Sequence, residues 1–231
     1  MNEAAEFEGF PPAALRFLEA LERDNSKTTF DAHRSAYEDA LLEPARDFVV
    51  SLGAELQRSV SPAIHAEPRV NGSIFRINRD TRFTKDKRPY KTHLDLFFWE
   101  GEGRSRECPG FFFRMTPRAI VLGAGRHHLR DPELAAYRKA VLDDRAGSEL
   151  ERAIDAVAAT GAELGGATYK RVPRGFDATH PRAELLKHTG LFVWQDHPLP
   201  KASASPAFAG WCADRLEPMA PVHRWLVEHL R

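Results

Sequence analysis

Apolar side chains recur every three or four residues through the first quarter of the chain, which is the spacing of one face of an α-helix. The first such stretch follows a proline pair that begins at Pro11, where proline suits a first helical turn. A second stretch runs from Thr29 to Leu42. A third opens at Pro44 and ends at Ser61. The pattern predicts consecutive helices over residues 10–60.

The periodicity changes after the Asn71-Gly72 dipeptide, which is a strong turn signal. Short apolar, aromatic and β-branched runs follow, and the connections between them are too short for crossover helices, so we expect an antiparallel sheet. Only Thr116–Arg118 separates the last two runs, which predicts a tight hairpin. The predicted strands are Ser73–Ile77, Leu94–Trp99, Gly110–Met115 and Ala119–Leu122.

Helical spacing returns in the last third of the chain. The predicted elements are a helix with its N-cap at Asp131, a helix over Glu149–Ala159, a short helix over Pro181–His188, a strand over Leu191–Trp194 and a closing helix over Pro218–Leu230. Helices followed by a meander and further helices indicate an α+β fold, with N-terminal helices, a central mostly antiparallel sheet and C-terminal helices packed on it.

No internal repeat and no domain-scale linker interrupts this order, so we expect a single domain over residues 1–231. Within that domain, residues 10–60 are expected to be helical. Residues 70–125 hold the sheet and a basic motif, and residues 130–231 are mixed and mostly helical.

Charge and cysteine content narrow the classes of function. The chain has 33 basic and 33 acidic residues, so its formal net charge is zero and any anion site has to be local. Met1–Gly9 does not resemble a signal peptide, and no apolar run approaches the ~18 residues of a membrane helix. Cys108 and Cys212 form no CxxC pair. We therefore expect a cytoplasmic protein with no membrane partner, and the oligomeric state is not predicted.

One segment, from Arg76 to His93, concentrates positive charge. It holds seven Arg or Lys and two Asp, a net charge of +5 between two predicted strands. Arginine forks pair with carboxylates and phosphates, and lysines add mobile charge. Such a run is often only a solvated face with internal ion pairs. Two features favour a packed segment that needs a partner: Phe83 and Tyr90 are interleaved with the charges, and Arg76 lies in an apolar strand.

The order of residues in this segment is distinctive: Arg76-x-x-Arg79-Asp80-Thr81-Arg82-Phe83-x-Lys85-Asp86-Lys87-x-Pro89-Tyr90-Lys91-Thr92-His93. A second block reads Lys170-Arg171-x-Pro173-x-Gly175-Phe176-Asp177-x-x-His180-Pro181 and is followed by Leu185-Leu186-Lys187. Together they resemble a bacterial and fungal family catalogued as domain of unknown function 2461. Thr29-Phe30 departs from the family pattern, in which an aromatic pair is expected. The resemblance implies a shared fold and site across most of the chain. It implies no reaction, because the family has no established activity.

The second block is also basic, and we expect it to face the first block across one cleft. The alternative is that it forms a turn and a helix start with structural roles only. The predicted ligand-binding residues are Arg76, Arg79, Arg82, Lys85, Lys87, Tyr90, Lys91, Lys170, Arg171 and Arg174.

Histidine titrates near neutral pH, so His93 and His180 are the candidates for general acid–base catalysis, with Asp80 as a possible partner. No spacing typical of metal ligands accompanies them, and the many neighbouring cations oppose a metal, so we expect neither a metal nor another cofactor.

Three hypotheses remain at the level of sequence. The leading one is a cleft that binds an anionic, phosphorylated small molecule, possibly an enzyme acting on it. The second is a nucleic-acid-binding module that uses the same basic segment, with Tyr90 stacking on a base. The third is a structural Arg–Asp lattice or an interface to a protein partner.

Overall fold

A computed structural model describes residues 6–103 and 105–230 of the chain. It confirms the predicted class, with N-terminal helices, a six-stranded antiparallel sheet and further helices towards the C-terminus. The expectation for Met1–Gly9 falls mostly on residues 1–5, which lie outside the described residues. In the ranges that are described, no helix combines the length and the apolar character needed to cross a membrane.

The described chain forms two compact units. The first contains the residues up to Phe98 together with Phe112–Val121 and Asp196–Asp214. The second contains Trp99–Phe111, Leu122–Gln195 and the residues from Arg215 onward. Several strands contribute residues to both units. The expectation of a single domain stays a prediction.

The predicted N-terminal helices are present, but the second of them is interrupted. Helix α1 spans Pro12–Arg23 and helix α3 spans Glu43–Ser59. The stretch expected as one helix is divided into α2 (Lys27–Ala32) and a π-helical segment (Ala36–Leu42). The Ser26 side chain caps α2 by accepting a hydrogen bond from the Thr29 backbone N–H.

Six strands form the sheet in the order β1-β2-β3-β4-β6-β5. The strands are β1 (Ile64–His65), β2 (Leu94–Glu100), β3 (Gly110–Met115), β4 (Ala119–Arg126), β5 (Glu163–Ala167) and β6 (His188–Pro198). Strands β3 and β4 are neighbours joined by the expected short hairpin, in which the Thr116 N–H donates to the Ala119 carbonyl.

One predicted strand and one predicted helix need correction, and one strand was not predicted. Ser73–Ile77 is not a regular strand, although the Ile74 backbone forms a bridge with Leu96 of β2. The predicted helix over Pro181–His188 is wrong: it is reduced to a 3-10 turn over Leu185–Lys187, because His188 begins β6 and pairs there with Ala167 of β5. Strand β5 was missed, since a glycine-containing, mostly exposed strand has no apolar alternation.

The later helices differ from the prediction mainly in where they begin. Helix α4 spans Asp131–Leu142, so Asp131 is its first residue rather than its N-cap. Helix α5 spans Asp144–Ala158 and begins earlier than expected, because the Asp143 side chain accepts hydrogen bonds from two N–H groups of its first turn. Helix α6 (Phe208–Leu216) was not predicted, and α7 spans Ala220–His229.

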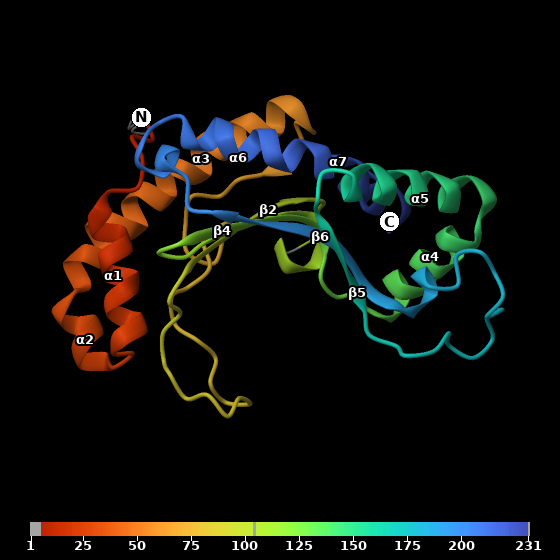
Figure 1. The fold of residues 1–231 in the computed structure, drawn as a ribbon, viewed down its shortest axis with the longest axis horizontal. Helices are drawn as coiled ribbons and strands as arrows, with labels where there is room; N and C mark the ends of the chain where they lie inside the picture. Colours follow the sequence, from red (N-terminus) through yellow and green to blue (C-terminus); the bar gives the residue numbers. More distant parts are fainter. Residues whose placement is uncertain (1–5, 104, 231) are drawn as a thin grey trace. The chain divides into compact units, whose positions relative to one another are not determined.

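The core of the first unit lies between the sheet and helices α3 and α6, which lie on the same side of it (Figure 1). The Phe48 ring of α3 stacks on Phe208 of α6 at 5.2 Å and lies 5.0 Å from Phe113 of β3. Phe113 is fully buried, as are Leu96 and Phe98 of β2. Successive strand side chains alternate between faces, so the residues between these point to the opposite face of the sheet.

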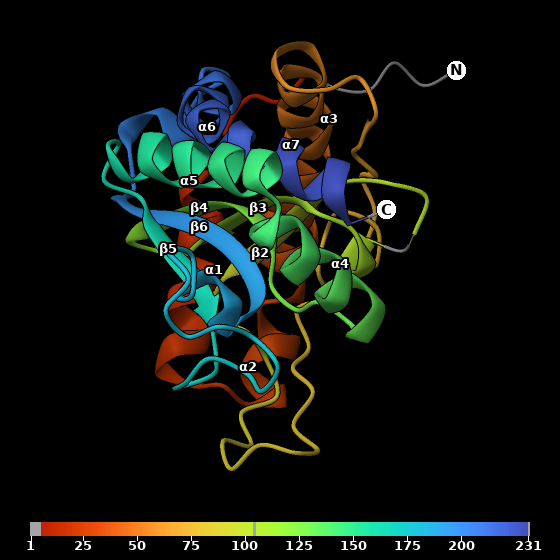
Figure 2. The same ribbon diagram turned by 90° about the vertical axis from the view of Figure 1, so that its right-hand side faces the viewer.

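The core of the second unit is held by α4, α5 and α7, with α5 and α7 on the same side of β6 (Figure 2). The Trp225 indole N–H of α7 donates to the Ala146 carbonyl of α5 at 2.8 Å. The buried Tyr137 hydroxyl of α4 donates to the Leu185 carbonyl at 3.0 Å. These bonds satisfy polar groups that would otherwise be costly to bury.

Candidate anion-binding site

The basic segment forms a long loop that extends from the sheet beside α2 (Figures 1 and 2). Its two arms pair at the base, where Asn78 faces Tyr90 in an antiparallel bridge. The Arg79 N–H donates to the Pro89 carbonyl, and the Lys91 N–H donates to the Ile77 carbonyl, both at 2.8 Å. The loop is therefore an ordered ribbon at its base.

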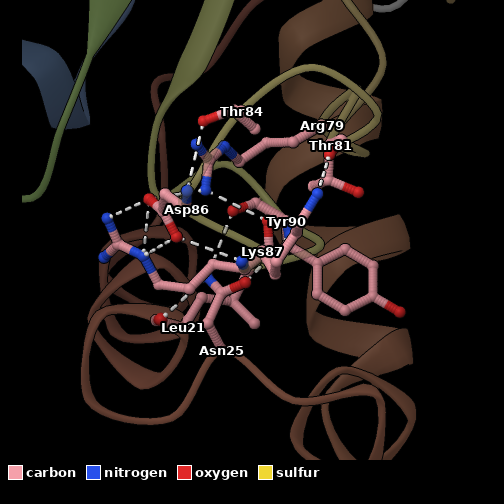
Figure 3. A network of polar contacts seen from close by, with 9 residues as sticks. Leu21, Asn25, Arg79, Thr81, Thr84, Asp86, Lys87 and Tyr90 are labelled. Carbon is pink, nitrogen blue, oxygen red and sulfur yellow. Dashed lines mark hydrogen bonds and ion pairs between the residues drawn. The ribbon is translucent and has the colours of Figure 1, made fainter.

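Asn25, which follows α1, holds the base of this loop (Figure 3). Its Oδ1 accepts the Tyr90 N–H at 2.9 Å, and its Nδ2 donates to the carbonyls of Tyr90 and Leu21, each at 3.1 Å. The Tyr90 ring is 8 % exposed and stacks on Phe30 at 4.4 Å. Tyr90 therefore anchors the loop, and its ring is already stacked within the protein.

Replacing Asn25 with alanine should release the base of the loop. The backbone groups of Tyr90 would lose both partners, which costs about 1–3 kcal/mol for a partly buried site. Hydrogen exchange followed by mass spectrometry should show faster exchange of the Tyr90 and Lys91 amides. Asn25→Asp keeps the acceptor for the Tyr90 N–H, so the exchange rates of these amides should lie between those of wild type and the alanine variant. Unchanged exchange in the alanine variant would contradict the anchoring role.

The two aspartates of the loop pair with its own arginines. Hydrogen bonds from the side chain and backbone of Arg82 hold the pKa of Asp80 well below its usual range. Arg88 does the same for Asp86, with a further contribution from Arg79 at 2.8 Å. Asp80 is thus kept ionised as a partner of Arg82, and it lies beside neither candidate histidine among the contacts of the described residues.

Arg76, Lys85 and Lys87 are exposed on the same loop. Lys87 Nζ donates to the Thr81 carbonyl at 2.8 Å, which ties the two arms of the tip together. No carboxylate of the described residues pairs with these three cations. They provide the open positive charge of the loop.

Three nitrogen-bearing side chains converge where the loop returns to the sheet, at the Asp95 carboxylate. Arg114 approaches it as a fork, with Nε 2.7 Å from Oδ1 and Nη2 3.2 Å from Oδ2. Lys91 Nζ lies 3.1 Å from Oδ2, and His93 Nε2 lies 3.2 Å from the same oxygen. We call Lys91, His93, Asp95 and Arg114 the Asp95 cluster.

Two neighbouring strands position this cluster. Asp95 lies on β2 and Arg114 on β3, both on the face opposite α3 and α6. Half-buried rings accompany the charges on this face: Arg114 lies 5.4 Å from the Phe112 ring, and Lys91 lies 4.9 Å from the Phe75 ring. The cations are thus held by strands and rings, which fix their positions better than a mobile loop would.

The charge balance of the cluster is positive. Burial raises the pKa of Asp95, but the hydrogen bonds from His93 and Arg114 outweigh burial and hold that pKa well below its usual range. Asp95 is 5 % exposed and stays ionised, so it offsets only one of the two permanent cations beside it. The cluster carries a net charge of +1 when His93 is neutral and +2 when it is protonated.

His93 is oriented by the same carboxylate. Its Nε2 faces Asp95, which leaves Nδ1 as the nitrogen able to exchange a proton with another group. The side chain is 23 % exposed, so a ligand or water can reach the ring. Of the three predicted catalytic residues, His93 is the one that the structure places among convergent charged groups.

The second basic block lies in the second unit. Lys170, Arg171 and Arg174 are exposed there. His180 Nδ1 accepts the Arg182 N–H at 3.1 Å, so its ring serves to cap a turn. The cleft shared by the two blocks stays a prediction. No group of three or more potential ligands in the described ranges could hold a metal ion.

Asp95 and Arg114 were missed from the sequence, although both carry a signal. Each is a charge flanked by apolar residues in a strongly apolar strand, Leu94–Glu100 for Asp95 and Gly110–Met115 for Arg114. A charge at such a position is expensive unless it is paired. Two opposite charges in neighbouring strands of a meander are natural partners for each other.

Comparison with known proteins gives one result at the level of the family. A family model described as "Conserved hypothetical protein (DUF2461)" matches residues 13–225. No curated protein and no solved structure matches the chain significantly.

Proposed function

Since the chain belongs to this family of conserved hypothetical proteins, DUF2461, we propose that the Asp95 cluster binds the anionic group of a phosphorylated small molecule. The proposal follows the contacts of the cluster, because the family carries no activity that could be transferred. The observation that supports it most is the convergence of three nitrogen-bearing side chains on one buried carboxylate.

The cluster keeps donors for a ligand after Asp95 is satisfied. Arg114 has five N–H groups and uses two of them on Asp95, and Lys91 has three and uses one. Among the described residues no second acidic group pairs with either side chain. The remaining N–H groups are held in place before a ligand arrives, which lowers the entropic cost of binding.

A phosphate group suits the remaining N–H groups of Arg114 and Lys91 better than a single carboxylate does. It presents several oxygens and up to two negative charges, whereas the cluster offers a guanidinium fork and an ammonium side by side. The half-buried Phe97 and Phe112 lie on the same face of β2 and β3 and would contact the remainder of the ligand.

Proton transfer is the chemistry that the cluster would add if the protein is an enzyme. His93 would exchange a proton through Nδ1, and Arg114 and Lys91 would stabilise charge on phosphoryl oxygens. Asp95 would position the three side chains, because both of its carboxylate oxygens accept from them.

A thermal-shift screen of the purified protein tests the proposal. Inorganic phosphate, pyrophosphate, nucleotides, sugar phosphates and citrate would be compared at equal ionic strength. A ligand at 100 times its Kd should stabilise the protein by about 2.7 kcal/mol, which is visible as a rise in Tm.

Two lysine variants make the screen specific to the cluster. Lys91→Met keeps an apolar stem against the Phe75 ring but removes the charge, so the rise in Tm should be lost. Lys85→Met removes an exposed charge from the same loop, and this variant should retain the rise in Tm. No shift with any anion, or equal shifts in both variants, would contradict a site at the Asp95 cluster.

A further inference from the structure

The tip of the basic loop, residues 79–88, presents an aromatic ring to solvent. Phe83 is 93 % exposed, whereas Tyr169, the next most exposed large hydrophobic side chain in the described ranges, is 48 % exposed. The Arg82 guanidinium lies 5.5 Å from the Phe83 ring centre. A phenylalanine in this position stabilises the free protein little, and its ring is open to a partner.

The tip is ordered although it is exposed. Asp80 and Asp86 each accept the backbone N–H two residues later, and the Thr84 hydroxyl accepts the Asp86 N–H at 3.2 Å. Lys87 bonds across the loop to the Thr81 carbonyl (Figure 3). A partner would therefore meet a preformed surface rather than a chain that has to be ordered on binding.

The tip that carries this ring is rich in positive charge. Residues 79–88 hold five Arg or Lys and two Asp, a net charge of +3. Arg82 and Arg88 keep 74 % and 60 % of their side chains exposed even while paired with these aspartates. An exposed ring on a loop tip rich in cations combines a stacking surface with contacts for a phosphate backbone.

We infer that the loop tip binds single-stranded nucleic acid, with a base stacked on Phe83 and backbone phosphates held by Arg82, Lys85 and Arg88. This goes beyond the small-anion site, because the tip and the Asp95 cluster share no residue. The guanidinium of Arg82 beside the ring extends the stack, since arginine and aromatic rings both stack on bases.

A membrane surface and a protein partner fit the tip less well than single-stranded nucleic acid does. A membrane would gain only one apolar side chain from the tip, because the neighbouring Ile77 and Tyr90 are 6 % and 8 % exposed. The core of a protein interface is depleted in Lys and Asp, which crowd this tip.

Fluorescence anisotropy with labelled oligo(dT) and oligo(U) of about twelve nucleotides tests the inference. Affinity should fall steeply as salt is raised, because bound phosphates release counterions. Phe83→Ala and Phe83→Leu should each weaken binding about tenfold, since leucine keeps the apolar surface but offers no ring for a base. Lys85→Gln should lower both the affinity and its dependence on salt.

Tyr169→Ala is the matched control, because Tyr169 is an exposed aromatic beside Lys170 and Arg171 in the second unit, and it should leave affinity unchanged. Arg114→Gln should also retain oligonucleotide binding, which separates this site from the small-anion site. The inference would be overturned by absent or salt-insensitive binding, by full affinity in Phe83→Leu, or by binding to anionic phospholipid vesicles without binding to oligonucleotides.

Discussion

Replacing Asp95 with asparagine is expected to lower the free energy of unfolding by about 2–4 kcal/mol. The carboxylate is buried and engages Arg114, Lys91 and His93 at 2.7–3.2 Å. Asparagine would leave two permanent cations without their counter-charge and would turn an amide N–H₂ towards N–H donors. The partners are partly exposed, so the effect lies below that of a fully buried pair.

The same substitution should change how stability depends on pH. Because the pKa of Asp95 is lowered in the folded state, its contribution is present above the unfolded value of about 3.9 and is lost as pH falls through the folded pKa. The difference in the free energy of unfolding between wild type and Asp95→Asn should therefore be largest at neutral pH and should shrink below about pH 4.

Urea unfolding of both proteins at several pH values measures this effect. Asp80→Asn is the matched control, because Asp80 forms its ion pair on the exposed loop and should leave stability nearly unchanged. Equal, small effects of the two substitutions would mean that the Asp95 cluster does not hold the sheet and loop together.

Arg126→Gln should lower the free energy of unfolding by about 3–5 kcal/mol. Its guanidinium is 4 % exposed and donates to the carbonyls of His128 and Arg106 at 2.9 and 2.7 Å, and to Glu133 at 3.1 Å. Glutamine cannot reach all three partners, so it would leave Glu133 half-buried and less well paired. This arginine belongs to the second unit, whereas the loop belongs to the first.

The two substitutions together test how the chain unfolds. If it is a single cooperative domain, as the sequence predicts, Asp95→Asn and Arg126→Gln lower the midpoint of one common transition. Circular dichroism and tryptophan fluorescence should then report coincident curves for each variant. Separate transitions, each sensitive to one variant, would show that the two units unfold independently.

The helices and central strands could be predicted because local patterns determine them. Apolar residues at helical spacing identified α1 and α3. Aromatic runs identified β2 and β3, and an aliphatic, β-branched run identified β4. Strand β5 escaped because Gly165 and Gly166 give it no apolar alternation. His188 was assigned to the end of a short helix over Pro181–His188, whereas it begins β6. Its true partner, Ala167, lies outside any local window.

The candidate site also combines features that local sequence determines with features that depend on distant contacts. The basic segment could be recognised because it departs from the neutral composition of the chain. Which of its residues anchor the loop and which stay exposed could not be predicted. Asn25 and Phe30 anchor Tyr90 from about sixty residues away along the chain, a non-local contact that spacing does not reveal. Asp95 and Arg114 belong to neighbouring strands, so their pairing depends on the register of the sheet.

Isothermal titration calorimetry of the best anion from the screen tests the central claim most directly, with wild type, Arg114→Gln and Arg118→Gln compared. Arg118 is the matched control, because it lies in the first unit at the β3–β4 turn and is 69 % exposed beside Glu22. We expect Kd to rise at least about tenfold in Arg114→Gln, since a charge-assisted fork is lost, and to stay unchanged in Arg118→Gln. Equal affinities in all three proteins would show that the anion binds elsewhere and that the Asp95 cluster is only structural.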